Sequence, residues 1–93
     1  MGTVKQAAQA GTIESSDILI ALSPAAAGSG IQIELVSPTA KQYGARMREV
    51  IAATLLAHGI KDAVVHANDK GALDYTIEAR TLTAIERAAG LGR

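Results

Sequence analysis

The chain has 93 residues, no cysteine, and equal numbers of basic and acidic residues, nine of each. This length predicts a single domain spanning residues 1–93, and a net charge of zero supplies no positive field for binding nucleic acid. Disulfides and zinc–cysteine sites are excluded, and no apolar run approaches the roughly 18 residues that cross a bilayer.

The first elements are read from apolar alternation. Residues 1–10 show no sharp period and are expected to form a loose lead-in; they lack the apolar core of a secretory signal, which favours the cytoplasm. Alternation over residues 18–22 predicts a strand with one face in the core. Pro and Gly punctuate residues 24–30, and residues 31–35 alternate again. We therefore expect a hairpin of two antiparallel strands.

A helix is predicted over residues 39–58. Its start carries either Ser37 as a cap before Pro38, or Thr39 as a cap in a capping box. Gly59 stands where a left-handed residue ends a helix. The apolar stripe at 3.6-residue spacing consists of Tyr43, Met47, Val50, Ile51, Thr54 and Leu55.

The remaining residues predict a second pair of strands and a short helix. Residues 63–67 form an apolar run, residues 68–71 suit a hairpin turn, and residues 73–80 alternate as a fourth strand. A final helix begins at Thr81 or Thr83. The order ββαββα predicts an α+β two-layer sandwich, with an antiparallel-rich four-stranded sheet and helices on one face.

The segment from Gly11 to Asp17 reads Gly-Thr-Ile-Glu-Ser-Ser-Asp, with two serine hydroxyls between two carboxylates. It resembles the Gly-Thr-Leu-Glu-Ser-(Ser/Gly)-Asp motif of the citrate lyase acyl carrier protein, the gamma subunit of that complex. Two later segments resemble the same family in the same order. They are Lys-Gln-Tyr-Gly at residues 41–44 and Asp-Lys-Gly-Ala-Leu-Asp at residues 69–74.

This resemblance implies a non-catalytic carrier subunit, a phosphoprotein with a prosthetic group on Ser15, the serine after the glutamate. In that family the group is 2′-(5″-phosphoribosyl)-3′-dephospho-coenzyme A, joined by a phosphodiester. Its thiol carries acetyl and then citryl as a thioester while citrate is cleaved to acetate and oxaloacetate. The implied partners are the alpha subunit (acyl transferase), the beta subunit (citryl lyase) and the transferase that attaches the group.

Strand parity gives a separate argument for Ser15 over Ser16. If alternation extends backward from Ile18, Ser16 lies on the core side and Ser15 lies on the outer side with Asp17. We therefore expect Ser15 to be the more accessible hydroxyl. Glu14 and Asp17 are interpreted either as solvated turn residues or as residues that the attaching enzyme recognises.

The chain supplies no evident catalyst of its own. A serine is a poor nucleophile unless a base lies within hydrogen-bond reach. The two histidines, His58 at the end of the predicted helix and His66 in a predicted strand, are not brought to Ser15 by any pattern. No catalytic residue and no metal site are therefore expected.

Two alternatives remain open. Asp69-Lys70-Gly71 locally resembles the hairpin of lipoyl and biotinyl domains, in which the lysine is modified, although those domains are all-β. Lys70 could instead be a solvated turn residue or contact the phosphates of an arm on Ser15. The second alternative is an unmodified interaction subunit. The intact mass of the native protein distinguishes these possibilities.

Overall fold

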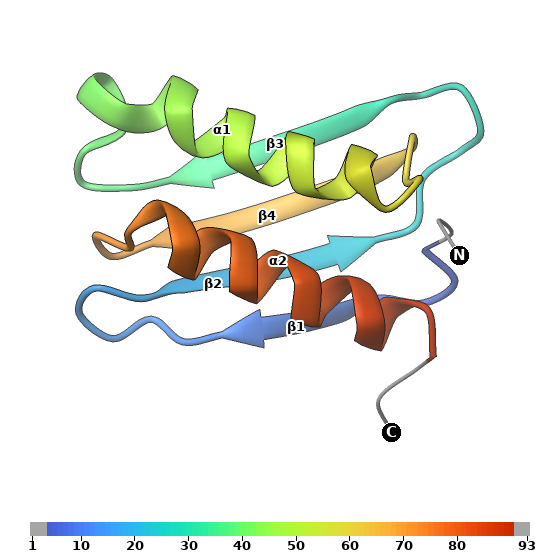
Figure 1. Ribbon diagram of the computed structural model, residues 1–93. Helices are drawn as coiled ribbons and strands as arrows, with labels where there is room; N and C mark the ends of the chain where they lie inside the picture. The colour runs from blue at the N-terminus through green and yellow to red at the C-terminus, as the bar shows by residue number, and fades with distance from the viewer. Residues whose placement is uncertain (1–3, 91–93) are drawn as a thin grey trace.

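In the described part of the chain, four strands form one sheet, and both helices pack on the same face of it (Figure 1). The computed structural model describes residues 4–90. The elements in chain order are β1 (Ala8–Gly11), β2 (Ile18–Ser23), β3 (Ile31–Val36), α1 (Ala40–Ala57), β4 (Ala63–Asp69) and α2 (Asp74–Ala88). α1 lies over β3 and β4, and α2 lies over β1 and β2 (Figure 1).

The strand order across the sheet is β1-β2-β4-β3. β2 pairs antiparallel with β1 and with β4, whereas β3 pairs parallel with β4. Neighbouring parallel strands need a crossover connection, and α1 provides it between β3 and β4. The predicted α+β sandwich, with an antiparallel-rich four-stranded sheet and helices on one face, is confirmed.

The order of elements differs from the prediction, because the chain runs βββαβα. The alternation over residues 73–80 predicts a strand, but Leu73 precedes α2 and the following residues belong to it. Leu73 and Tyr75 are exposed, and the buried positions follow helical spacing. These positions are Ile77, Thr81, Ala84, Ile85 and Ala88. The predicted hairpin turn at residues 68–71 therefore leads from β4 into a helix.

The fourth strand is β1, which lies within the segment expected to be a loose lead-in. Ala8–Gly11 pairs with β2 at the edge of the sheet, and Ala10 is buried there. Val4 is also buried in the core. The prediction of a loose lead-in is thus wrong for these residues, while residues 1–3 lie outside the described part.

The predicted hairpin between β2 and β3 is also wrong. The two strands run in opposite directions, but β4 lies between them. The connection over residues 24–30 is held at the start of β4 by Asp62, the residue before that strand. Its Oδ1 accepts hydrogen bonds from the backbone N–H groups of Gly28 at 3.0 Å and Gly30 at 2.8 Å. Sequence separation alone gave no sign of this inserted strand.

The long helix is confirmed as α1, and its stripe packs on the aliphatic core of the sheet. Met47, Ile51 and Leu55 are buried against Ile18, Ile20, Leu22 and Val65, among others. Tyr43, predicted to belong to the stripe, is instead 50% exposed. The predicted capping box is not formed, because Thr39 makes no capping hydrogen bond with its side chain. Within residues 4–90, neither helix has the length and apolarity that a membrane span requires.

Candidate functional site

The three motif segments meet at one end of the sheet. The β1–β2 loop (residues 12–17), the β4–α2 loop (residues 70–73) and the start of α1 lie together there (Figure 1). Two backbone hydrogen bonds join the two loops: Ser16 N–H donates to Lys70 O at 2.8 Å, and Lys70 N–H donates to Asp17 O at 2.9 Å. These bonds continue the β2–β4 ladder, whose last pair is Ile18 with Asp69.

Ser15 lies at the tip of a tight turn. Asp17 N–H donates to Glu14 O at 3.1 Å, and Ser15 and Ser16 are the two central residues. Ser16 has φ of +65°, the left-handed conformation of the third position of some β-turns. Both serines are exposed, and within residues 4–90 neither hydroxyl makes a hydrogen bond. The parity argument is therefore wrong, because the segment before Ile18 turns instead of extending as a strand.

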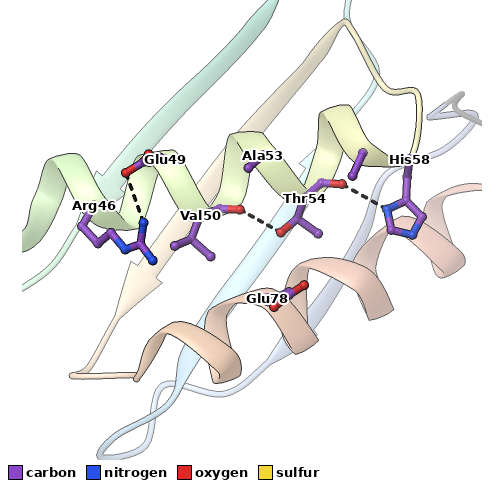
Figure 2. Close-up of a pocket in the computed structure, with 8 residues that line it drawn as sticks. Arg46, Glu49, Val50, Ala53, Thr54, His58 and Glu78 are labelled. Atoms are coloured by element: carbon purple, nitrogen blue, oxygen red, sulfur yellow. Dashed lines mark hydrogen bonds and ion pairs between the residues drawn. The ribbon is translucent and has the colours of Figure 1, made fainter.

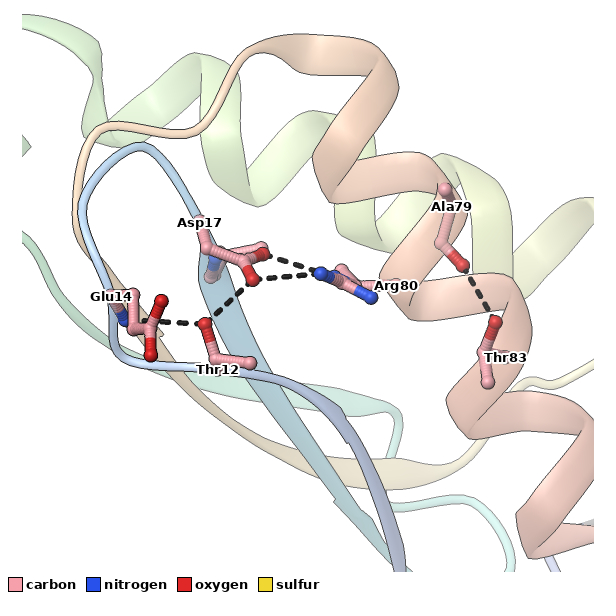
Figure 3. A network of polar contacts seen from close by, with 7 residues as sticks. Thr12, Glu14, Asp17, Ala79, Arg80 and Thr83 are labelled. Carbon is pink, nitrogen blue, oxygen red and sulfur yellow. Dashed lines mark hydrogen bonds and ion pairs between the residues drawn. The ribbon is translucent and has the colours of Figure 1, made fainter.

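Asp17 fixes the end of this turn to α2 (Figure 3). Its Oδ1 accepts from Arg80 Nε at 2.9 Å and from Ile18 N–H at 2.7 Å. Its Oδ2 accepts from Arg80 Nη2 at 2.7 Å and from Thr12 Oγ1 at 2.7 Å. The Asp17 side chain is only 14% exposed. It is thus a structural residue, and the interpretation as a solvated turn residue is wrong.

The charges of this contact reinforce one another. The Arg80 guanidinium, followed by the Thr12 hydroxyl and the Ile18 N–H, holds the pKa of the Asp17 carboxyl well below its usual range. Asp17 in turn raises the pKa of Arg80. Burial opposes both effects but is outweighed. The pair is therefore ionised at neutral pH and ties the loop to the helix.

Gly11 closes the other end of the loop. Its φ is +100°, and a Cβ atom built there would lie 1.9 Å from Ile18 O. Thr12 next to it accepts a hydrogen bond on Oγ1 from Glu14 N–H at 3.2 Å. The Glu14 side chain is exposed and makes no hydrogen bond to residues 4–90. Glu14 thus keeps both interpretations that its position predicted.

Asp69 organises the second loop from a fully buried position. Its Oδ2 accepts from Ser37 Oγ at 2.7 Å and from Gly71 N–H at 3.0 Å, and its Oδ1 accepts from Ala72 N–H at 2.9 Å. This carboxylate links the lead-in of α1 to the loop that carries Lys70. Lys70 itself is exposed beside the Ser15 turn, and its ammonium makes no hydrogen bond or ion pair within the described residues.

Neither histidine is close to the serines. His66 lies on the sheet face without helices, where its Nδ1 is 3.1 Å from Glu34 Oε1. His58 follows the last turn of α1, and its Nδ1 lies 3.1 Å from Thr54 O (Figure 2). It lines a hollow of about 260 Å³ that extends along α1 to Arg46. Within residues 4–90, no three His, Cys, Asp or Glu side chains cluster so that they could hold a metal ion.

Comparison with known proteins gives the same assignment for nearly the whole chain. The family described as malonate decarboxylase delta subunit (MdcD), an acyl carrier protein family, matches residues 5–88. The citrate lyase acyl carrier protein of Lacticaseibacillus casei is 56% identical over 86 residues, covering 92% of this chain and 83% of the relative. Its counterparts in Streptococcus uberis and Halothermothrix orenii are 52% and 48% identical, over 95% and 92% of this chain. These relatives are themselves covered to 85% and 89%.

A solved structure agrees on the fold. A chain in the crystal structure of a Pseudomonas malonate decarboxylase hetero-tetramer in complex with malonate superposes with a TM-score of 0.74. The match covers 91% of this chain and 86% of that chain at 17% identity, so it supports the fold alone.

The family match over residues 5–88 shows that this α+β sandwich is an acyl carrier protein. The chain belongs to the citrate lyase acyl carrier protein family. It is therefore a carrier subunit and not the catalytic subunit of a citrate lyase, and it works in a complex with other subunits. A covalently attached prosthetic group is a general property of this class.

Proposed function

We propose that this single domain, residues 1–93, carries 2′-(5″-phosphoribosyl)-3′-dephospho-coenzyme A on Ser15 in the cytoplasm. The observation that supports Ser15 is its place at the exposed tip of a turn whose two ends are fixed. Its hydroxyl is not engaged by any of the described residues. A phosphodiester can therefore form there without breaking an existing contact of the side chain.

Ser15 also fits the group better than Ser16. The backbone N–H of Ser16 is bonded to Lys70 O, and its φ of +65° makes it the constrained residue of the turn. A substituent on Ser15 leaves both features intact. The family motif independently places the group on the serine after the glutamate. These two arguments replace the parity argument, which the turn excludes.

The bound group would supply a thiol, which this cysteine-free chain lacks. The chain's own residues keep the attachment point accessible and anchor the turn through Asp17 and Arg80. Tethering gives effective concentrations in the millimolar range at sites that the arm can reach. This suits the proposed partners, an alpha subunit that transfers the acyl group and a beta subunit that cleaves the citryl thioester to acetyl and oxaloacetate.

Lys70 is better interpreted as a neighbour of the arm than as its attachment point. The fold is not the all-β sandwich of lipoyl and biotinyl domains, and residues 70–73 lead into a helix instead of forming a hairpin tip. Lys70 is joined to the Ser15 turn by two backbone hydrogen bonds, and its ammonium is exposed. We propose that it partly neutralises the phosphates attached to Ser15.

Co-expression with the attaching transferase tests the proposal. The intact mass of the wild-type chain and of Ser16→Ala should increase by the mass of the nucleotide group, whereas Ser15→Ala should remain unmodified. Lys70→Ala should still be modified, which separates the proposal from a lipoyl-type carrier. A modified Ser15→Ala beside an unmodified Ser16→Ala would overturn the assignment.

A further inference from the structure

Attachment at Ser15 leaves one feature of the same end of the molecule unexplained. A groove of about 440 Å³ lies between the start of α1 and the loop before α2. Residues 71–74 of the last motif segment form one wall, and Tyr43 of the segment at 41–44 lies in the other, so residues of both segments that lack the attachment point line the groove. The lining residues are Thr39, Tyr43, Arg46, Met47, Gly71, Ala72, Leu73 and Asp74.

We propose that this groove holds the neutral, amide-bearing chain of the arm attached to Ser15, together with a small acyl thioester at its end. This inference rests on the proposed function, because it takes the arm to be on Ser15. The groove volume falls within the range of about 300–1,000 Å³ that is typical of small-molecule sites.

The groove continues directly from the attachment turn. Ser16, next to Ser15, is bonded to Lys70, and Gly71, next to Lys70, already lines the groove. An arm leaving Ser15 therefore has a short path past Lys70, whose exposed side chain is cationic and suits phosphates, before it reaches the apolar walls. This order of charge along the path matches an arm that is anionic near its attachment and neutral toward its thiol.

The chemistry of the lining favours a neutral occupant. Arg46 is already paired, with Asp74 Oδ2 at 2.9 Å and with Glu49 Oε1 at 3.3 Å. The backbone N–H groups of Gly71 and Ala72 already donate hydrogen bonds to the Asp69 carboxylate. Among the lining residues, no cation is thus left without a carboxylate partner to attract a free carboxylate, such as those of a citryl group.

The apolar walls supply the attraction. Met47 is buried at the groove and offers a flexible, polarisable surface, while Tyr43 and Leu73 are half-exposed or more without a partner in the core. Tyr43 is the residue that its spacing predicted to be buried. Its exposure at the groove has an explanation if the ring covers the chain of the arm.

Two measurements on the loaded full-length chain test this inference. Amide NMR shifts should differ between the loaded and unloaded protein at Ala72 and Leu73 as well as around Ser15. The thiol should also react with a soluble aromatic disulfide more slowly than free coenzyme A does. A groove occupied for about 80% of the time slows this reaction about fivefold, because only the unbound fraction reacts.

The two tyrosines provide a matched pair of variants. Tyr43→Ala should remove the slowing and the shifts at Ala72 and Leu73. Tyr75→Ala should retain both, because Tyr75 is 71% exposed and does not line the groove. Equal effects of the two variants would overturn the inference.

The wild-type NMR comparison keeps the test decisive even if a variant folds poorly. Shift changes confined to residues 12–17, or a thiol that reacts as fast as free coenzyme A, would refute binding of the arm in the groove. The carrier proposal would still hold if the intact mass shows the group on Ser15. An unmodified Ser15 would instead refute the carrier proposal itself. If the amide signals of the groove residues shift only when a partner subunit is added, the groove is a docking surface and the inference is contradicted.

Discussion

Replacing Gly11, the last residue of β1, by alanine should strongly destabilise the protein at the start of the serine loop (residues 12–17). Gly11 has φ of +100°, and its added Cβ would lie 1.9 Å from Ile18 O, a backbone atom of the neighbouring strand. Left-handed backbone costs a residue with a Cβ about 1–2 kcal/mol. Relieving the overlap by moving backbone adds about 1–3 kcal/mol. We therefore expect Gly11→Ala to lower the free energy of unfolding by about 2–5 kcal/mol.

Gly71→Ala is the matched control. Its φ is +98°, but nothing lies within 4 Å of the added Cβ. It should lose only the conformational part, about 1–2 kcal/mol. Urea denaturation of both variants measures the difference, provided that the m-value is unchanged. Equal losses would show that the close approach of Gly11 to Ile18 does not constrain the loop, and would refute the reasoning.

The remaining predictions concern the anchors of the two loops. The depressed pKa of Asp17 means that its contribution to stability is present above the unfolded pKa, about 4, and is lost as pH falls toward the folded pKa. Asp17→Asn should therefore have a lower free energy of unfolding than wild type at pH 7. In denaturation measured as a function of pH, this difference should narrow progressively as the pH falls below about 4. A difference that stays constant would contradict this. Asp69→Ala should lower the free energy of unfolding, measured with heat or urea, by on the order of 3 kcal/mol, because it leaves the Ser37 hydroxyl and two N–H groups without their acceptor. A loss below about 1 kcal/mol would show that water replaces the carboxylate. Ser16→Gly should be tolerated, because glycine adopts φ of +65° readily, and it should still be modified on Ser15. Ser16→Val should unfold at a lower urea concentration, because a β-branched residue disfavours that conformation.

The sequence predicts the elements whose periods are long or strict. α1, β2 and β3 are predicted because their apolar residues repeat at 3.6 or 2 positions over most of each element, and β4 is predicted because residues 63–67 form an apolar run. α2 was misassigned at its start because Leu73, Tyr75 and Ile77 alternate by chance. Only Ile77 among them is buried. A window extended to Ala88 would have shown the helical spacing.

β1 and the strand order could not be read in the same way. Ala8–Gly11 consists of Ala, Gln and Gly, so it carries no apolar alternation, and it is identified as a strand only by its pairing with β2. The insertion of β4 between β2 and β3 depends on the crossover by α1, a property of the whole fold. Pairing partners are tertiary information that a local pattern does not contain.

The candidate site shows the same division. The motif favours Ser15, which is exposed at the tip of a turn; Ser16 is exposed as well, so the difference in access expected from strand parity is not found. Arg80 was missed because it is 63 residues away from Asp17 in sequence. The only sign of this ion pair in the sequence is the carboxylate of Asp17, which the motif places beside the serines.

The fixed ends of the serine loop suit the attachment of a prosthetic group that we propose for it. Under that proposal, Ser15 has to be accessible to the attaching transferase, and the arm has to reach the active sites of the partner subunits. If the loop were mobile, each docking event would have to order it, and ordering lowers affinity. Here Gly11, the Asp17–Arg80 pair and the two hydrogen bonds to Lys70 hold both ends of the loop. The motion needed for transfer is thereby left to the arm, and the protein presents it from one defined position.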